Sequence, residues 1–489
     1  FRHSKRPKSV SLLGLTSIKF SLTFLFKLMI SENKRSFEMK IVKFGGSSLA
    51  TGESVAQAIQ IILSDPQRQV MVVSAPGKRN TTDIKVTDLL IKYADLALKH
   101  KNCVEIVNKI FSRYQEIGHY FGLADTELSI IKQILLELPN QGYPNEKYLL
   151  AAFKAHGERL NARLITLILC HQGINSRFLD PAEAGLIVTG EPNDAIVNPE
   201  SYLNLDQIKI KADERIVFPG FFGMTPSGNI ATFSRGGSDI TGAILARGFH
   251  ADLYENFTDV NGIFAANPHI IEHPQSIKKM TYREMRELSY AGFSVFHDEA
   301  LIPAIQGQIP INVKNTHDPS NPGTMIVPEK DFVPDNAIAG VTSQKHFSAL
   351  YLHKYLLNKE AGFTLRILQI LYQHNIPYEH MPSGIDDITI IFNNDFLNDQ
   401  LIDQICNEIQ ATINPDQLEW IEDYAIIMVV GEGMRQKHTI SRQIIDSLGD
   451  HDISPQMINQ GASQISIMIG TKKEKADEAV KIIYQKFFN

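Results

Sequence analysis

Residues 40–48, which read Lys-Ile-Val-Lys-Phe-Gly-Gly-Ser-Ser, constrain the fold of this chain more than any other stretch. The first five residues have the β-branched and aromatic character of a buried strand. Beyond the glycines, apolar residues recur at the i, i+3, i+4, i+7 spacing of a helix face: Val55, Ala58, Ile59 and Ile62. Paired glycines let the backbone approach a ligand closely, and their N–H groups can point at phosphate oxygens. The segment therefore predicts a strand–turn–helix unit that binds an anionic group.

Lys43 places a mobile positive charge at the end of this strand, where it could stabilise a transferring phosphoryl group. The segment is not a Walker phosphate loop, in which Gly-Lys-Ser/Thr follows four intervening residues, and it is not the Gly-x-Gly-x-x-Gly dinucleotide turn. Taken alone, it is equally compatible with an ordinary strand–turn–helix junction that carries a solvated lysine. Other motifs have to decide between these interpretations.

Four further motifs follow in an order that resembles the amino-acid kinase superfamily and, within it, the monofunctional aspartate kinases. They are Val-Val-Ser-Ala-Pro-Gly at 72–77, His-Gly-Glu at 156–158, Ser-Arg-Gly-Gly-Ser-Asp at 234–239 and Phe-Thr-Asp-Val-Asn-Gly-Ile at 257–263. The resemblance extends from about Met39 to the C-terminus. Each motif is weak evidence alone, whereas the ordered set is highly specific.

The composition of the 489 residues fits a soluble globular enzyme with two or three domains, since 43% are hydrophobic and 21% are charged. The net charge of the chain is −6. Residues 1–38 by themselves carry a charge of +6, from eight Lys and Arg against two Glu. The remainder, at −12, is an acidic body that argues against a nucleic-acid partner. Three scattered cysteines without metal-ligand spacing predict reduced thiols in a cytoplasmic protein: Cys103, Cys170 and Cys406.

Residues 1–38 differ in character from the rest of the chain. Residues 10–30 are apolar, but Lys19 and Lys27 interrupt them and no small-residue cleavage site follows. We expect Met39 to be the native start and residues 1–38 to be a leader outside the native protein. A transit peptide is the alternative, and a membrane anchor is the least favoured interpretation, so no membrane partner is expected.

Helices and short apolar strands alternate from residue 41 to about 313, which predicts a mostly parallel sheet covered on both faces. Strands are expected at 70–74, 216–219, 229–233 and 253–258. The stretch 87–170, with a helix at 151–169, is expected to form a helical lobe over the substrate pocket. The resemblance implies that 39–325 form a catalytic domain with the amino-acid kinase fold, a three-layer αβα sandwich.

An internal repeat is visible in the C-terminal part. Residues 375–384 precede a strand at 388–390 as residues 452–461 precede one at 465–467. Helices are expected before these segments, at 364–373 and 439–447, and after them, at 396–411 and 473–487. Such units resemble ACT domains, which bind amino acids at their interfaces. We expect two α+β ACT-like regulatory modules, at 340–415 and 416–489; the alternative is an ordinary α+β appendage.

The resemblance implies transfer of the γ-phosphoryl group of ATP to the β-carboxylate of L-aspartate. Such a step needs alignment and charge stabilisation more than covalent help. Lys43 would neutralise the transferring group, and Asp239 would cap a helix or orient Lys43. Phosphate oxygens would be held by Gly45, Gly46 and Ser47, and the nucleoside by Thr258 and Asp259. Mg²⁺ would be held mainly by phosphates and water, so no protein ligand is named.

The same resemblance assigns the amino-acid substrate. Arg235 suits the α-carboxylate because its planar fork can bond both oxygens, and Glu158 suits the α-ammonium. The remaining expected substrate contacts are Ser74, Thr87, Phe221, Gly236, Gly237 and Ser238.

Two departures from the family pattern concern the nucleotide. Many aspartate kinases have Ala-Lys-Val-Leu-His-Pro where residues 293–298 read Phe-Ser-Val-Phe-His-Asp, so Ser294 replaces a nucleotide-side lysine. His269 similarly replaces a common arginine. Both changes affect the expected contacts with ATP.

The resemblance also implies feedback regulation of the first step of lysine, threonine and methionine biosynthesis. The expected effectors are lysine and/or threonine, with Phe363 and Glu379 as candidate contacts, although Glu379 could equally be a solvated charge. A homodimer or dimer of dimers through the ACT-like modules is expected, without a fused homoserine dehydrogenase. The competing interpretations are another amino-acid kinase, such as a glutamate or uridylate kinase, and an amino-acid sensor with an inactive kinase scaffold.

Overall fold

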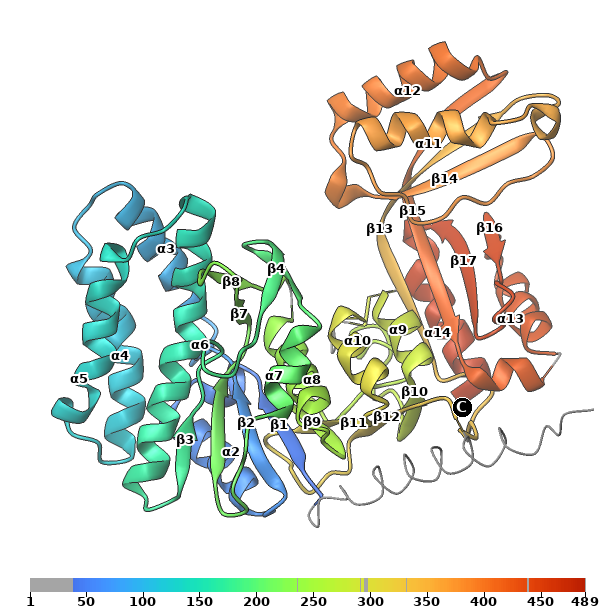
Figure 1. The fold of residues 1–489 in the computed structure, drawn as a ribbon. Helices are drawn as coiled ribbons and strands as arrows, with labels where there is room; N and C mark the ends of the chain where they lie inside the picture. Colours follow the sequence, from blue (N-terminus) through green and yellow to red (C-terminus); the bar gives the residue numbers. More distant parts are fainter. Residues whose placement is uncertain are drawn as a thin grey trace, which may run out of the picture.

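The computed structural model describes residues 38–234, 236–290, 292–293, 298–330, 332–437 and 439–488. A larger α/β part comes first in the chain, and a smaller C-terminal part follows it as two stacked modules (Figure 1). Residues 1–37 of the expected leader, Arg235 and Ser294 lie outside the described residues. The three cysteines are free, as expected for reduced thiols. In the described part of the chain, no helix combines the length and apolar character that a membrane crossing requires.

An eight-stranded sheet forms the centre of the larger part, in the order β10-β12-β11-β9-β1-β2-β6-β3. Its strand pairs are parallel except for β11 and β12. The strands are β1 Lys40–Phe44, β2 Arg68–Val73, β3 Ser176–Phe178, β6 Arg215–Pro219, β9 Leu253–Thr258, β10 Lys279–Thr281, β11 Ile311–Asn315 and β12 Thr324–Val327.

The strands expected at 70–74, 216–219 and 253–258 are confirmed as β2, β6 and β9. The strand expected at 229–233 also exists, as β8 (Ile230–Thr232), but it does not join the central sheet. It pairs instead with β7 (Phe222–Met224) in a separate antiparallel hairpin. A second hairpin consists of β4 (Val188–Glu191) and β5 (Asp194–Val197).

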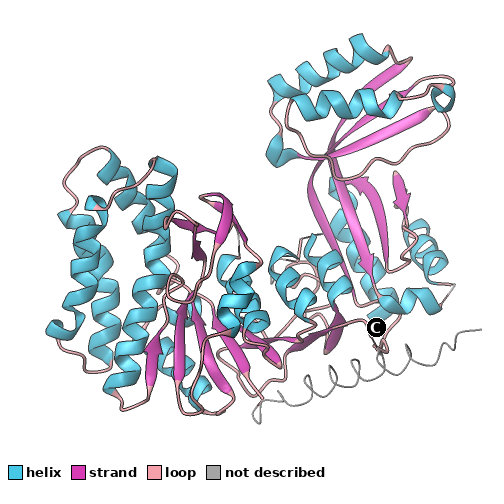
Figure 2. Cartoon of the chain, viewed as in Figure 1, coloured by secondary structure: helices cyan, strands magenta, loops and turns pink. Residues whose placement is uncertain are grey.

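Helices cover both faces of the central sheet, so the expected three-layer sandwich is confirmed (Figure 2). Because successive side chains of a strand point to opposite faces, Ile41 and Val42 enter different hydrophobic clusters. The Val42 face packs on α2 Gly52–Leu63, α3 Val86–Leu98, α4 Val104–Tyr120, α5 Asp125–Glu137 and α6 Glu146–His171. The Ile41 face packs on α7 Glu200–Asp206, α8 Gly237–Gly248, α9 Tyr282–Tyr290 and α10 Asp298–Gly307.

The C-terminal part contains one five-stranded antiparallel sheet in the order β14-β13-β15-β17-β16. Its strands are β13 Gly340–His353, β14 Asp387–Asn393, β15 Gln417–Val430, β16 Met457–Asn459 and β17 Ser466–Lys472. Its helices are α11 Phe363–Gln373, α12 Asp399–Ile413, α13 Ile440–Gly449 and α14 Ala476–Phe488. In Figure 1, α11 and α12 belong to the upper module and α13 and α14 to the lower one.

The two modules share β13 and β15, each 14 residues long. Residues 347–353 of β13 pair with β14, and residues 349–353 also pair with 417–421, in the upper module. Residues 340–344 pair with 426–430 in the lower module. A register shift between Gln344 and Phe347 marks the passage from one module to the other. The expected boundary between residues 415 and 416 therefore falls in front of a strand that serves both modules. The modules are interleaved rather than consecutive.

A buried ion pair links two strands of the central sheet across β1. The Arg68 guanidinium of β2 donates two hydrogen bonds, of 2.6 and 3.0 Å, to the Glu255 carboxylate of β9. It donates a third, of 2.7 Å, to the carbonyl of Ile61 in α2 and lies 5.5 Å from the ring centroid of Phe257. The pair therefore connects β2, β9 and α2 away from water.

We expect Arg68→Met to destabilise the protein by about 3–5 kcal/mol, because the Glu255 carboxylate would remain buried without its partner. The double variant Arg68→Met/Glu255→Met removes both charges and should recover much of this loss. Denaturant unfolding of the wild type and both variants checks the order. Equal destabilisation by the single and double changes would show that the uncompensated carboxylate is not the cause.

Candidate active site

The predicted motifs meet at one edge of the central sheet. Strands β9, β1, β2 and β6 are adjacent and parallel, so their carboxyl ends lie together, where ligands of open α/β sheets bind. The segments that leave these strands begin at Asp259, Gly45, Ser74 and Gly220, respectively. The sheet topology thus brings segments together that are more than 200 residues apart in the sequence.

Lys43 is almost completely buried, with 7% of its surface exposed, although it carries an ammonium group. Its Nζ lies 2.5 Å from Oδ1 of Asp239 in the first turn of α8, so the predicted contact between these residues is present. Asn256 is the strand neighbour of Lys43 on β9, and its Nδ2 donates to the same Asp239 oxygen at 2.9 Å. The Asp239 carboxylate is therefore fixed from two adjacent strands.

Sequence reasoning did not identify Asn256. The available signal was an amide in the interior of a strand whose central residues are buried. Such a polar side chain needs a partner, because an unsatisfied buried polar group is costly. The Asn256 side chain meets this need through Asp239, while its Oδ1 is buried with no hydrogen-bond partner among the described residues.

The glycine turn is packed against the neighbouring loop of β2. The Gly77 N–H donates to the Gly46 carbonyl at 2.8 Å, and a Cβ on Gly46 would lie only 2.8 Å from the Ala75 carbonyl oxygen. Gly46 has an ordinary helical conformation, with φ −63°, so glycine is needed there for space. The loops after β1 and β2 are thereby locked together.

The expected role of the Gly45 N–H differs from what the structure shows. This N–H donates to the Phe257 carbonyl at 3.2 Å, because the parallel pairing of β1 with β9 continues one residue past Phe44. It is therefore engaged within the sheet rather than directed at a ligand. Ser47, which starts a 3₁₀ turn at Ser47–Leu49, remains exposed at this edge.

Glu158 lies on α6 and is 6% exposed. It approaches the loop after β2 because Gly157 has no side chain; a Cβ there would be 2.7 Å from the Ala75 Cβ. Burial raises the pKa of Glu158 to about 8, while a hydrogen bond from the Ala75 backbone and the charge of Lys154 act in the opposite direction. Its Oε2 is buried without a hydrogen-bond partner among the described residues. Such an oxygen is suited to accept a hydrogen bond from a ligand.

Phe221, after β6, adopts a left-handed backbone conformation with φ +80°. Its N–H donates to Thr241 Oγ1 at 3.0 Å, and its carbonyl accepts from the Phe233 N–H at 2.9 Å. A Cβ on Gly237 would lie 2.5 Å from the Phe221 ring. Backbone strain of this kind at a bulky residue persists where the surroundings enforce it, often at ligand sites.

The remaining predicted residues lie near these groups. The Asn161 side chain donates a 2.7 Å hydrogen bond to the Ser74 carbonyl. Sequence reasoning did not identify Asn161 either. Thr87 is in the first turn of α3, whose Val86 N–H donates to the Pro76 carbonyl. The structure thus brings these predicted residues to one edge: Lys43, Gly45, Gly46, Ser47, Ser74, Thr87, Glu158, Phe221, Gly236, Gly237, Ser238, Asp239, Thr258 and Asp259.

The two expected effector residues lie apart from this edge, on the upper module. Phe363 packs in that module's core, so its side chain is not open to a ligand. Glu379 accepts a hydrogen bond from Tyr290 at the end of α9, and burial raises the pKa of Glu379. The Tyr290 ring also meets His380 edge-to-face at 6.1 Å. Glu379 therefore contacts the larger part of the protein and is not a solvated charge.

Helix α9 is also held at its other end. Thr281 and Glu284 form a reciprocal capping box, with hydrogen bonds of 2.8 and 3.1 Å. The second Glu284 oxygen accepts a 2.7 Å hydrogen bond from the Glu432 N–H of the lower module. One helix of the larger part thus contacts both C-terminal modules.

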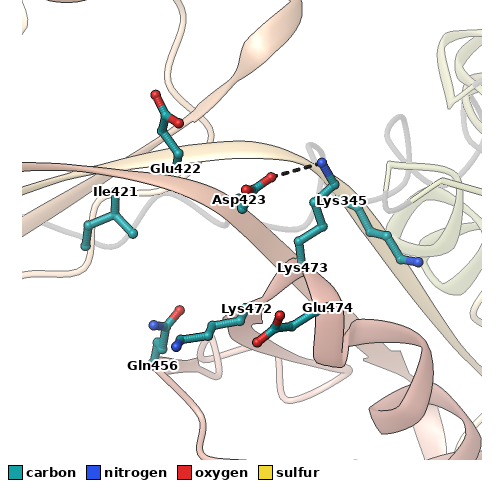
Figure 3. Close-up of a pocket in the computed structure, with 8 residues that line it drawn as sticks. All are labelled: Lys345, Ile421, Glu422, Asp423, Gln456, Lys472, Lys473 and Glu474. Carbon is teal, nitrogen blue, oxygen red and sulfur yellow. Dashed lines mark hydrogen bonds and ion pairs between the residues drawn. The ribbon is translucent and has the colours of Figure 1, made fainter.

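A cavity of about 660 Å³ lies where β13 and β15 pass between the modules. Charged residues of both signs surround it: Lys345, Glu422, Asp423, Lys472, Lys473 and Glu474 (Figure 3). Several of these charges are already paired, Lys473 with Asp423 at 3.0 Å and Lys345 with Asp477 at 2.5 Å. Neither Phe363 nor Glu379 is among its lining residues.

Comparisons with known proteins agree with this architecture. The model of the amino acid kinase family matches residues 38–315, and an ACT domain model matches residues 427–487. Aspartokinase 3 of Bacillus subtilis (strain 168) is 44% identical over 450 residues, covering 92% of this chain and 99% of that protein. The crystal structure of Clostridium acetobutylicum aspartate kinase is 35% identical with a TM-score of 0.80, covering 92% of this chain and 100% of that one.

Two crystal structures of E. coli aspartokinase III share the fold at lower identity. The complex with aspartate and ADP has a TM-score of 0.74 at 21% identity, and the complex with lysine and aspartate has 0.73 at 22%. Each comparison covers 92% of this chain and 100% of the other. The family model spans more than half of the chain, and the Bacillus protein is matched over nearly its whole length. The chain therefore belongs to the aspartate kinase family of amino acid kinases and is an enzyme that phosphorylates the carboxyl group of aspartate.

Proposed function

We propose that the carboxyl edge of the central sheet binds ATP and L-aspartate with Lys43 between the γ-phosphoryl group and the β-carboxylate. The observation that carries this proposal is the buried cluster of Lys43, Asp239 and Asn256. A fixed ammonium in a site with little water stabilises developing negative charge strongly and needs little reorganisation. Asp239 and Asn256 hold it in position until the two anions arrive.

The nucleotide is proposed to lie along the segments that follow β1 and β9. Ser47, Gly46 and the N-terminus of α8 at Gly237 and Ser238 offer donors to phosphate oxygens, since helix N-termini favour anions. Thr258 and Asp259 would hold the nucleoside. A Mg²⁺ ion would be held mainly by the nucleotide phosphates and water. Ser294 and His269 would alter contacts that other family members make with ATP.

The aspartate is proposed to lie between α6 and the segment after β6. Glu158 would bind its ammonium through the unpartnered Oε2, and Phe221 would line the pocket. Arg235 would bind the α-carboxylate through its two-pronged guanidinium. Ser74 and Thr87 would lie near the β-carboxylate. The shared fold with an aspartate- and ADP-bound relative supports this arrangement.

We expect Lys43→Met to lower aspartate-dependent ADP formation by about 10²–10³-fold, the usual cost of losing one preorganised charge donor. A coupled assay with aspartate, and with glutamate as a control acceptor, measures this effect. Wild-type turnover in the variant would remove Lys43 from the mechanism. Equal rates with glutamate would favour a broader amino-acid kinase.

Asn256→Leu should lower kcat by about 10–100-fold, because a hydrogen bond to a charged group contributes about 1.5–3 kcal/mol. Asn312→Leu is the matched control, since Asn312 is on neighbouring β11 and also has a buried, unpartnered amide oxygen among the described residues. Steady-state kinetics should show the loss in kcat only for Asn256→Leu. Similar losses in both variants would indicate a general packing defect.

We further propose that residues 39–325 form the catalytic domain and that the interleaved modules make the enzyme feedback-inhibited by lysine, threonine or both. The step would open lysine, threonine and methionine biosynthesis in the cytoplasm. A homodimer or dimer of dimers through the ACT-like modules would offer an interface pocket for the effector. Glu379, and the backbone at the start of α11 beside Phe363, are the proposed effector contacts. The lysine-bound relative with the same fold supports this proposal.

Helix α9 offers a route from the effector site to the nucleotide. It contacts Glu379 at one end and Glu432 at the other, so a shift of either module changes its position. Residues 293–298, where the family has its nucleotide-side lysine, follow α9 directly in the sequence. An effector that draws Glu379 away from Tyr290 would release one end of this helix.

We expect lysine, alone or with threonine, to inhibit at millimolar concentration. Glu379→Gln and Tyr290→Phe should change the concentration needed for half-inhibition by about 5–150-fold, the usual range of allosteric coupling. Tyr372→Phe is the control, because Tyr372 lies on the same module with 84% of its surface exposed. Inhibition curves are compared with each variant's own uninhibited rate. Absence of any effect of lysine or threonine on the wild type would refute the regulatory proposal but not the kinase reaction.

A further inference from the structure

Lys154 is a half-buried cation beside the proposed aspartate pocket for which sequence reasoning assigned no role. It lies on α6 four residues before Glu158, and residues at this spacing share one helix face. Its Nζ donates to Asn193 Oδ1 at 2.8 Å, between β4 and β5, and lies 5.3 Å from the ring centroid of Phe221. The ammonium is thus fixed by a hairpin and by a pocket residue.

Burial of this ammonium has an energetic cost, which lowers the pKa of Lys154. Among the described residues, no carboxylate lies within ion-pair distance of Nζ to compensate for that cost. The charge of Lys154 nevertheless acts on Glu158, whose carboxylate it stabilises. A half-buried cation held by a neutral amide, one helical turn from a buried acid, points to an electrostatic role in the pocket.

The groups around Glu158 indicate that Lys154 supplies this electrostatic effect. The groups that interact with Glu158 include Lys154 on its own helix, Tyr114 on α4 and the Ala75 backbone after β2. Tyr114 is fully buried, and its pKa is raised well above its ordinary value, so it carries no positive charge to offer. Lys154, one helical turn before Glu158 on α6, is therefore a cation that stabilises the ionised Glu158.

We propose that Lys154 is a positioning residue for aspartate, which stabilises the ionised form of Glu158 so that its carboxylate can bind the ammonium of the substrate. The inference rests on the proposed role of Glu158. Direct ion pairing between the two residues would occupy the carboxylate and compete with the substrate. Because Asn193 and Phe221 fix the ammonium, it supports the charge of Glu158 while leaving Oε2 open.

This arrangement sets a direction for the pH dependence. Because burial raises the pKa of Glu158 to about 8, its carboxyl group gains its charge as the pH rises through that value. Aspartate binding should therefore improve between pH 6.5 and 8.5, where the substrate ammonium stays protonated. Loss of the Lys154 charge makes ionisation of Glu158 harder. The rise in aspartate binding should therefore occur at higher pH.

The test compares Lys154→Met with Lys147→Met by steady-state kinetics from pH 6 to 9. Lys147 is on the same helix and bonds the same hairpin through Glu191 at 2.9 Å, but 68% of its side chain is exposed. We expect Lys154→Met to raise the KM for aspartate at pH 7 by about 3–10-fold, since one pKa unit changes the ionised fraction about tenfold. The KM for ATP should stay constant, Lys154→Arg should restore aspartate binding, and Lys147→Met should resemble the wild type.

Two results would overturn the inference. In the first, the pH dependence of the KM for aspartate is unshifted in Lys154→Met, and the KM values for aspartate and ATP rise in parallel. This result would indicate a structural role only. The second is wild-type behaviour of Lys154→Met while Glu158→Gln still raises the KM for aspartate; the proposed function of Glu158 would then survive. If Glu158→Gln also leaves this KM unchanged, the proposed aspartate pocket fails together with the inference.

Discussion

A lysine ammonium held almost entirely out of water is the constraint on which the larger part of this protein depends. The side chain of Asp239 lies 2.5 Å from the Lys43 ammonium, and Asn256 fixes Asp239 from the next strand. This arrangement requires β1 and β9 to be neighbours in register and α8 to begin at the same edge. The order of the central strands, the start of α8 and the tight packing of the glycine loops all satisfy this requirement.

The sequence was sufficient to predict four of the eight central strands (β1, β2, β6 and β9), a sheet covered by helices, and most of the candidate residues that the structure brings to its carboxyl edge. Period-two and period-3.6 patterns reveal buried faces, and the ordered motifs identify the family. Asn256, Asn161 and Lys154 escaped notice because their roles arise only when segments distant in the sequence come together. The direction of the Gly45 N–H was unpredictable for the same reason, since it depends on how far the pairing with β9 continues.

The C-terminal part shows a second limit of sequence reasoning. The internal repeat was found correctly, and its helices and strands occur close to the expected positions. A repeat in the sequence, however, does not show which strands pair with each other in the shared sheet. Residues 340–344 come before the upper module in the sequence but pair with a strand segment of the lower module. This pairing becomes visible only in the folded chain. Glu379 similarly gains its partner Tyr290 from a different part of the protein.

The shared strands also determine how regulation can be separated from catalysis. A single cut at residue 415 would deprive the upper module of residues 417–421 and leave the lower module dependent on a strand from before the cut. Exchange of the upper module with that of a relative therefore needs two junctions. The natural positions are the register shift after Gln344 and the left-handed turn at Asp423. An upper module can enter this architecture only as an insertion between the two lower-module halves of β13 and β15, and not as a fusion at the end of the chain.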